Sequence, residues 1–465
     1  MNDMMMKVEV VSTEIIKPSC PTPLHLKSFN LSYLDQIAPP SQIALLLYYN
    51  NDNNNQITSE IDSSCTILKK SLAEALSKFY PLAGKVIDNR FVDCNDDGVD
   101  YFESKVSNCQ LSQLIQLPNV QDLAKIFLPF DPFADSDEGN STKVLSVQVN
   151  VFEDCGGIVI GLCISHKLAD ACSVITFIND WASIARAIAT ADHDQQIKGP
   201  LFEAQSLFPL KEFLTGFKPP TAPRIVAGDD VIVTKKFVFG SSKLAELKKK
   251  AKIDSEIDDV HEQLNYQPTR VQALSALIWR CFIDTDQAKN KGANPTEVYL
   301  ALFAINLRAR MIPPLPLNSF GNVTSVALPM VMSKEVAGNK KNDQQYYPYL
   351  VGKVRDSIKK IDGDYVRDLQ TSNAFLDGMK SFSENGPSAE TLILSFTSWC
   401  RFPIYEANFG WGKPIWVGSC TLPMKNAVYL MDTNSSGDGI EAWVSLSKED
   451  MNEFERHPEL VAVVS

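Results

Sequence analysis

This chain lacks the sequence patterns of several large enzyme classes. It has no G-x-S-x-G, on which α/β-hydrolases mount a nucleophilic serine, and no H-E-x-x-H pair for a catalytic zinc ion. It also has no G-x-G-x-x-G or Walker A segment, the usual cradles for nucleotide phosphates. We therefore expect neither a serine hydrolase, nor a metal site, nor a nucleotide cofactor bound in those ways.

Basic residues are in deficit, and long apolar runs are absent. Lys and Arg number 44 against 56 Asp and Glu, a net charge of −12, which argues against a nucleic-acid partner but allows a local basic pocket. The longest apolar run, Ile43–Tyr49, is too short to span a bilayer, and residues 1–11 show no secretory signal. The ten cysteines form no C-x-x-C pair. We expect a cytoplasmic protein with reduced thiols and no membrane partner.

Length and composition predict two α/β domains. A chain of 465 residues, 45% hydrophobic and 22% charged, exceeds one ordinary domain and can bury a sizeable core. Predicted strands and helices interleave along it, which favours α/β layers. Residues 201–230 hold several prolines and are predicted to form a crossover. It would link an N-terminal domain over 1–200 to a C-terminal domain over 231–465.

Hydrophobic periodicity predicts the individual helices and strands. Apolar residues at helical spacing predict helices over 67–79 and 174–184, and Pro268 predicts another that begins near Arg270. A charged helix is expected over 242–252 and a polar loop over 254–267. Alternating or continuous apolar residues predict strands over 145–151, 158–164, 232–239, 298–305 and 323–331.

His166 is the strongest candidate for chemistry among five histidines, because it alone has an acid four residues later, Asp170. It follows a predicted buried strand, where loops deliver functional groups. A neutral imidazole there can remove a proton from a hydroxyl near pH 7. The same spacing also suits a histidine hydrogen-bonded at a helix start, so the pattern alone leaves both interpretations open. Cys163 is a second possible nucleophile nearby. It lies in an apolar run, which should raise the pKa of its thiol and lower its reactivity.

Two segments of the second half carry unusual residues. Residues 408–412, Asn-Phe-Gly-Trp-Gly, interleave aromatics with glycines. They predict a rigid loop, which could anchor a core or serve catalysis. Arg308 ends a predicted apolar strand. If it is buried, it needs an anionic partner, for which Asp170 is a candidate; otherwise it is a solvated charge at a strand end.

These segments together resemble the BAHD acyltransferases of plants. His166–Asp170 matches the family's HxxxD, and Asn408–Gly412 matches its DFGWG. The local sequence around these motifs is most similar to that of the clade of alkaloid-acylating enzymes and acylsugar acyltransferases. Weaker matches follow in the family's order over most of the chain, at residues 34–36, 79–85, 92–96, 397–399 and 438–443.

The resemblance implies two chloramphenicol-acetyltransferase-like domains of similar size, with a solvent channel between them. It implies a monomer that uses acyl-CoA as a co-substrate and holds no permanent cofactor. The acceptor would be a hydroxyl of a plant specialised metabolite, such as an alkaloid alcohol or an acylsucrose. His166 would be the general base in a ternary complex, without a covalent intermediate.

The resemblance also implies roles around the reacting groups. Thr397 and the indole N–H of Trp399 would donate hydrogen bonds to the oxyanion. Thr269 and Arg270, at a helix start, would contact phosphate groups of CoA.

Other residues are implied to be structural. Asp170 would point away from the substrate, pair with Arg308 and hold the loop of His166. Asn408 departs from the family's aspartate, because it keeps an acceptor oxygen but loses the charge. The rest of its loop would fix a turn: Phe409, Gly410, Trp411 and Gly412.

Two rival functions remain open at this level. A thioesterase would use His166 to activate water, and it would release free acid from acyl-CoA without an acceptor. A degenerate family member acting as a binding protein would release no CoA with a broad panel of acceptors, although the presence of both His166 and Asp170 speaks against it.

Overall fold

The computed structural model forms two compact units, each threaded by more than one segment of the chain. It describes residues 6–50, 57–116, 125–132, 144–190, 197–215, 231–251, 267–289, 295–340, 343–385, 390–419, 424–434 and 438–464. The first unit comprises Met1–Thr221, Leu315–Val323 and Phe402–Thr421, and the second unit comprises the remainder. The predicted boundaries need correction, because two segments of the second half, one carrying Asn408–Gly412, belong to the first unit.

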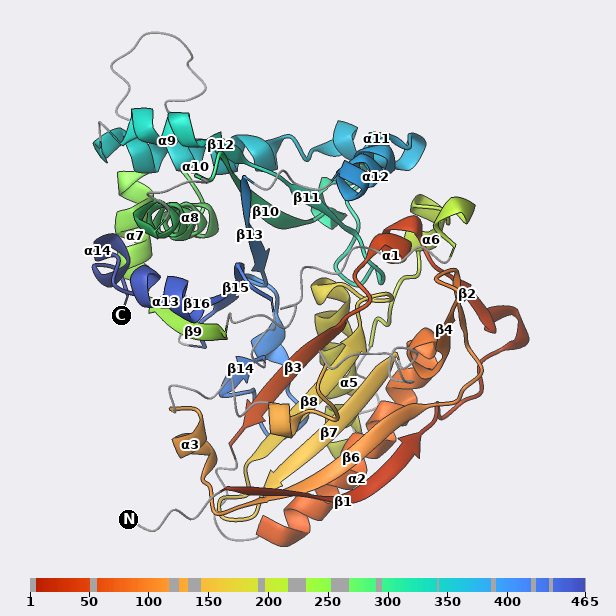
Figure 1. Cartoon of the computed structure of the whole chain (residues 1–465). Coiled ribbons are helices and arrows are strands. Elements are labelled where there is room, and N and C mark those ends of the chain that lie inside the picture. Colours follow the sequence, from red (N-terminus) through yellow and green to blue (C-terminus); the bar gives the residue numbers. More distant parts are fainter. Residues whose placement is uncertain are drawn as a thin grey trace. The chain divides into compact units, whose positions relative to one another are not determined.

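The first unit is built on a six-stranded sheet with the order β1-β6-β7-β8-β3-β14. Its strands are β1 (Lys7–Ile16), β3 (Gln42–Tyr49), β6 (Val99–Ser107), β7 (Leu145–Phe152), β8 (Ile158–Ser165) and β14 (Trp416–Gly418). A small sheet joins β2 (Ser28–Asn30), β5 (Phe91–Asp93) and β4 (Lys85–Ile87). Helices α2 (Ile57–Lys78) and α5 (Ala171–Thr190) lie against one face of the large sheet (Figure 1). The short helices are α1 (Tyr33–Ile37), α3 (Leu111–Leu114) and α6 (Ala204–Leu207).

Strand β7 is buried on both faces, although its alternation of apolar and polar residues is typical of a half-buried strand. Its polar residues Gln148 and Asn150 are buried together with Val147 and Val149. Their side-chain amides donate to backbone oxygens of Ile126 and Phe127 at 3.0 Å. Buried amides are tolerated when they are hydrogen-bonded, so the segment that covers this face supplies the acceptors that the alternating pattern could not reveal.

The two long helices of the first unit confirm the predicted apolar faces. The five apolar residues at helical spacing in this segment are all fully buried: Leu68, Leu72, Ala75 and Leu76 of α2, and Phe79 just after it. Trp181 of α5 donates its indole N–H to Ser71 of α2 at 3.0 Å. The helix predicted over 67–79 begins earlier, at Ile57.

The second unit is built on a seven-stranded sheet with the path β11-β10-β13-β15-β16-β9, to which β12 adds by pairing with β10. Pairs β10–β13 and β13–β15 are parallel and the others are antiparallel. Helices α7 (Ser241–Lys250), α8 (Arg270–Lys289) and α13 (Lys448–Phe454) gather on one side of it (Figure 1). The strands are β9 (Ile232–Phe239), β10 (Val298–Asn306), β11 (Thr324–Ala327), β12 (Met330–Met332), β13 (Thr391–Ser398), β15 (Ala427–Asp432) and β16 (Ile440–Ser447).

Helices of the second unit agree with the predictions where these were made. Helix α7 spans Ser241–Lys250 and α8 spans Arg270–Lys289. The predicted polar loop over 254–267 lies, except for Gln267, outside the described residues. The other helices are α9 (Ser333–Asn339), α10 (Asp343–Lys359), α11 (Gly363–Thr371), α12 (Ala374–Asn385), α13 (Lys448–Phe454) and α14 (Pro458–Val461).

The strand predicted over 323–331 is divided into β11 and β12. Both pair with β10, but residues 328 and 329 belong to neither strand. Pro329 has no backbone N–H to donate to a ladder, which explains the interruption.

The loop 408–412 is held by one side chain and one buried ring. Asn408 Oδ1 accepts hydrogen bonds from the backbone N–H of Gly410 at 2.9 Å and of Gly412 at 3.1 Å. Both glycines have φ near +115°, at 118° and 111°, a region that side chains disfavour. Phe409 is fully buried, whereas Trp411 is half-buried and stacks on it at 5.7 Å. Phe409, rather than Trp411, is therefore the main anchor.

Membrane-spanning helices and disulfides can be assessed for the described residues. No helix among them is long and apolar enough to cross a membrane. None of the nine cysteines in this part of the chain forms a disulfide, and Cys163 is fully buried.

We predict that Asn408 stabilises its loop through an acceptor oxygen and not through a charge. Asn408→Ala removes two hydrogen bonds and should lower the free energy of unfolding by about 1–2 kcal/mol. Asn408→Asp keeps an acceptor and should change it by less than about 1 kcal/mol. Denaturant unfolding of the three proteins measures both; an alanine variant as stable as the parent would contradict the role.

Candidate active site

His166 lies in the short turn between β8 and α5. Strand β8 is buried along its length, and its last residue, Ser165, pairs with Gln42 of β3. The backbone N–H of His166 donates to Ser41 at 2.9 Å. Residues 165 and 167–170 are buried, and His166 alone is partly exposed. The buried strand and helix thus present one imidazole at the end of the sheet.

Asn322 fixes the tautomer of His166. Its Oδ1 lies 3.1 Å from His166 Nδ1. Its Nδ2 donates to the backbone oxygen of His166 at 2.7 Å and to Asp35 Oδ1 at 2.8 Å. Because both neighbours of Nδ2 are pure acceptors, the amide oxygen must face Nδ1, which then carries the hydrogen. Nε2 is left with a free lone pair, the form required of a general base.

Asp35 holds the amide of Asn322 in that orientation. It is buried, and it accepts four hydrogen bonds at 2.6–2.9 Å, two from Asn322 and two from Ser32. Burial raises the pKa of Asp35, and these donors act in the opposite direction. Lys167 is also buried nearby, donates to Gln36 at 2.7 Å, and has its pKa lowered by burial to about 8. Ser32, Asp35 and Asn322 therefore form a buried polar cluster that is hydrogen-bonded to His166.

The pKa of His166 itself is lowered from its usual value. Burial disfavours the charged imidazolium, and this effect outweighs the favourable influence of Asp170. The imidazole is consequently neutral at neutral pH and able to accept a proton.

Asp170 acts on the backbone of its own unit. Its Oδ1 accepts from the N–H of Ser173 at 2.8 Å, in the first turn of α5, and its Oδ2 accepts from Val323 at 3.1 Å. Ser173 Oγ in turn bonds the backbone oxygen and N–H of Gly321 at 2.9 and 3.0 Å. Asp170 thus joins the turn of His166 to the segment that carries Asn322.

Gly321 makes this segment fit. Its φ is +131°, and a Cβ built on it would stand 2.9 Å from the Cβ of Ala204. Both the backbone conformation and the close approach exclude a larger residue there. The sequence predicted a role for Asp170 but none for Asn322 or Ser32, and Asp35 was noted only within the family match at residues 34–36. Polar residues far apart in sequence give no periodic signal that would join them.

Arg308 is fully buried, as one of the two sequence interpretations required. It lies just after β10, and its backbone N–H and guanidinium both donate to Asn306 Oδ1 at 3.0 and 3.2 Å. Arg308 belongs to the second unit and Asp170 to the first, and their pairing stays a prediction.

Thr397 and Trp399 stand at the end of β13, between β10 and β15. Trp399 is 7% exposed, and its backbone N–H donates to Leu430 at 2.8 Å. Its indole N–H has no hydrogen-bond partner among the described residues, a property shared with Trp279 and Trp411. A buried donor without a partner is costly. At a strand end beside Thr397, such a donor is suited to a ligand oxygen.

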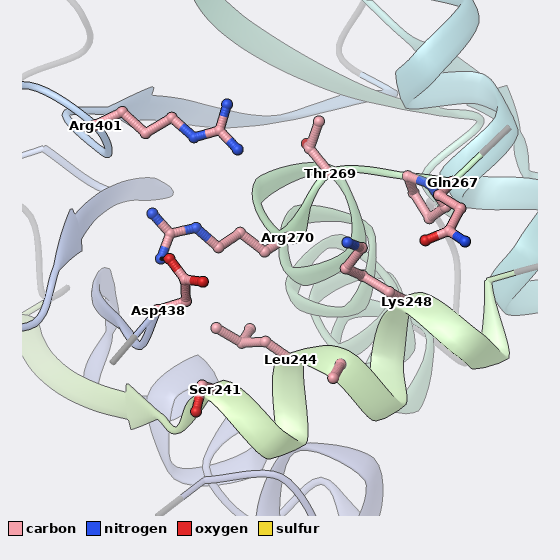
Figure 2. Close-up of a pocket in the computed structure, with 10 residues that line it drawn as sticks. Ser241, Leu244, Lys248, Gln267, Thr269, Arg270, Arg401 and Asp438 are labelled. Carbon is pink, nitrogen blue, oxygen red and sulfur yellow. Dashed lines mark ion pairs between the residues drawn. The ribbon is translucent and has the colours of Figure 1, made fainter. Parts of the chain in front are cut away.

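A cationic cavity of about 310 Å³ lies in the second unit at the start of α8. Its charged lining residues are Lys248 of α7, Arg270 of α8, Arg401, two residues after Trp399, and one acid, Asp438 (Figure 2). Thr269 caps α8. Its Oγ1 accepts from the backbone N–H of Gln272 at 3.1 Å, and the backbone N–H of Thr269 donates to Gln272 Oε1 at 3.0 Å. The three cations outnumber this acid, and together with the N-terminus of α8 they favour an anionic ligand.

Other chemistries find little support in the described residues. No group of three or more His, Cys, Asp or Glu side chains there could hold a metal ion. The alternative nucleophile Cys163 is fully buried in β8.

Comparison with known proteins places the chain in a family. The model of the Transferase family matches residues 6–461. Stemmadenine O-acetyltransferase of Catharanthus roseus is 38% identical over 96% of both chains. Vinorine synthase of Rauvolfia serpentina is 36% identical over 96% of this chain and 95% of its own, and a limonoid 21-O-acetyltransferase of Melia azedarach is 36% identical over 99% of both.

Solved structures agree. The crystal structure of vinorine synthase matches with a TM-score of 0.78 at 34% identity, over 99% of both chains. TRI101 of F. sporotrichioides, complexed with coenzyme A and T-2, shares the fold with a TM-score of 0.69 at 17% identity. The chain therefore belongs to the Transferase family, the BAHD acyltransferases, and is an acyl-CoA-dependent O-acyltransferase.

Proposed function

We propose that His166 is the general base in the transfer of the acyl group from acyl-CoA to a hydroxyl of a plant specialised metabolite. The observation that carries the proposal is the hydrogen bond of His166 Nδ1 to an amide oxygen whose orientation is fixed by Asp35. It leaves Nε2 as the only ring position that can take a proton.

The reaction then proceeds in one ternary complex. Nε2 takes the proton of the acceptor hydroxyl while its oxygen attacks the thioester carbonyl carbon. The tetrahedral oxyanion accepts hydrogen bonds from the indole of Trp399 and from Thr397. When it collapses, the C–S bond breaks, the ester is formed, and the imidazolium returns its proton to the CoA thiolate.

The acceptor is proposed from the relatives. Those compared above are named for alkaloid and limonoid substrates, which favours a polycyclic alkaloid or terpenoid alcohol; an acylsucrose is the alternative from the sequence resemblance. We further propose that the enzyme acts as a cytoplasmic monomer. A thioesterase activity would appear as free acid formed without acceptor. Mass spectrometry of a donor-by-acceptor panel tests the acceptor and the thioesterase alternative, size-exclusion chromatography tests the monomer, and a fluorescent-protein fusion tests the location.

Removing the base should abolish most turnover. His166→Ala should lower kcat by roughly 10²–10⁴-fold while CoA still binds in calorimetry. A general base must be neutral before it can take a proton. Because burial lowers the pKa of His166, the neutral form persists to a lower pH, and activity is lost only as the pH falls through that lowered pKa. The acidic limb of kcat/KM should therefore lie below 6.5.

Asn322→Ala serves as the positioning control. It leaves the imidazole but frees its tautomer, so kcat should fall by up to roughly 100-fold, with less effect on the KM for acyl-CoA. Near-normal turnover in His166→Ala would overturn the mechanism, and near-normal turnover in Asn322→Ala would overturn only the tautomer assignment.

We predict that Asp170 and Arg308 are coupled. If they pair, removing either charge leaves the other buried and unpaired, and should lower the free energy of unfolding by about 3–5 kcal/mol. Asp170→Ala also removes two hydrogen bonds that its carboxylate accepts from backbone N–H groups. The double variant should then cost less than the sum of the single ones in denaturant unfolding. Simple additivity would show that the two residues do not interact.

We propose that the cationic cavity binds phosphate groups of CoA. Hydrogen bonds to charged groups contribute about 1.5–3 kcal/mol, so Lys248→Ala should raise the KM for acyl-CoA by roughly 10–100-fold. Acyl-pantetheine, which lacks the nucleotide phosphates, should show no such change. Lys360→Ala, an exposed lysine that follows α10, is the control for net charge. An equal rise with both donors would contradict the assignment.

A further inference from the structure

Asp432 links two features of the second unit that are described separately above. It is the last residue of β15, and its side chain is 28% exposed. Its Oδ1 accepts from Arg270 Nη2 at 2.6 Å, and its Oδ2 accepts from the backbone N–H of Arg401, also at 2.6 Å. One carboxylate therefore bonds both the cationic cavity and the turn that follows Trp399.

The turn is an unusual piece of backbone that needs support. Arg401 has a φ of +69°, in the left-handed region that a residue other than glycine enters at a cost. Strand β15 secures the turn at two points: Leu430 accepts from the N–H of Trp399 at 2.8 Å, and Asp432 accepts from Arg401. The direction in which the Trp399 side chain leaves β13 thus depends on β15.

The guanidinium of Arg270 is likewise fixed before any ligand arrives. Its side chain is 13% exposed and stands at the wall of the cavity (Figure 2). The 2.6 Å hydrogen bond to Asp432 sets its position there. Asp438 approaches the same guanidinium only to 3.5 Å and is 88% exposed. Asp432 is consequently the carboxylate that decides where Arg270 stands.

We infer that Asp432 is a positioning residue that aligns the acyl-CoA phosphate site and the oxyanion donor Trp399 with each other. This inference rests on the proposed function. Its content is that one side chain serves both affinity for the CoA phosphates, through Arg270, and the chemical step, through the turn of Trp399. Neither task involves contact between Asp432 and the reacting atoms.

The two tasks can be separated by substitution. In Asp432→Asn the single amide oxygen can still accept from the Arg401 N–H, but the NH₂ group then faces the guanidinium of Arg270, donor against donor. This variant should keep kcat within about 3-fold and raise the KM for acyl-CoA by roughly 10-fold or more. Asp432→Ala loses both bonds, and its kcat should also fall, by roughly 10–100-fold.

Acyl-pantetheine makes the separation visible. With this donor, Asp432→Asn should behave as the parent, whereas Asp432→Ala should keep its loss of kcat. Asp368→Asn, an exposed position on α11, controls for the change of net charge. Thermal unfolding of each variant establishes that it is folded; should Asp432→Ala fail to fold, the comparison of Asp432→Asn between the two donors decides.

The outcomes distinguish this inference from the function on which it rests. If Lys248→Ala leaves the KM for acyl-CoA unchanged, the phosphate site is wrong. If Lys248→Ala behaves as expected but Asp432→Asn and Asp432→Ala share one pattern of kcat and KM, or Asp432→Asn raises KM equally with both donors, the dual role of Asp432 is overturned.

Discussion

The side-chain amide of Asn322 is the contact on which the proposed chemistry depends. Both hydrogens of its nitrogen are committed, one to Asp35 and one to the backbone of His166. The oxygen is therefore presented to the imidazole without a competing orientation. A buried network of this kind is valuable only when every member is satisfied, and Ser32, Asp35, Asn322 and His166 satisfy one another. The reactive nitrogen can then face the substrate without a further protein partner to hold it.

Much of the fold was accessible from the sequence because periodicity reports burial. The face of α2 that carries Leu68 and Leu76 and the continuous run of β8 were both recognisable from spacing alone. The buried polar residues of β7 were not, because their acceptors come from a segment that precedes the strand by some twenty residues. Patterns describe one element at a time, whereas burial on a second face depends on what covers it.

The candidate site was only partly accessible for the same reason. His166 and Asp170 stand four residues apart and form a recognisable motif. Asn322 lies 156 residues from His166 and 287 from Asp35, and no property of an isolated asparagine marks it as a partner. Trp399 and Arg270 were indicated by resemblance, but the carboxylate between the cavity and the turn, Asp432, emerged only from three-dimensional contacts.

The last strand of the first sheet carries a consequence for biosynthesis. Strand β14 at Trp416–Gly418 pairs with β3 at Leu46–Tyr48. The edge of that sheet is therefore completed by residues that lie close to the C-terminal end of the 465-residue chain. At translation rates of 5–20 residues per second, roughly 10–50 s separate synthesis of β8 from synthesis of β14. During that interval β3 is an open edge, the kind of surface that invites wrong pairing. The nascent enzyme should therefore depend on chaperones until the ribosome has delivered its C-terminal segments.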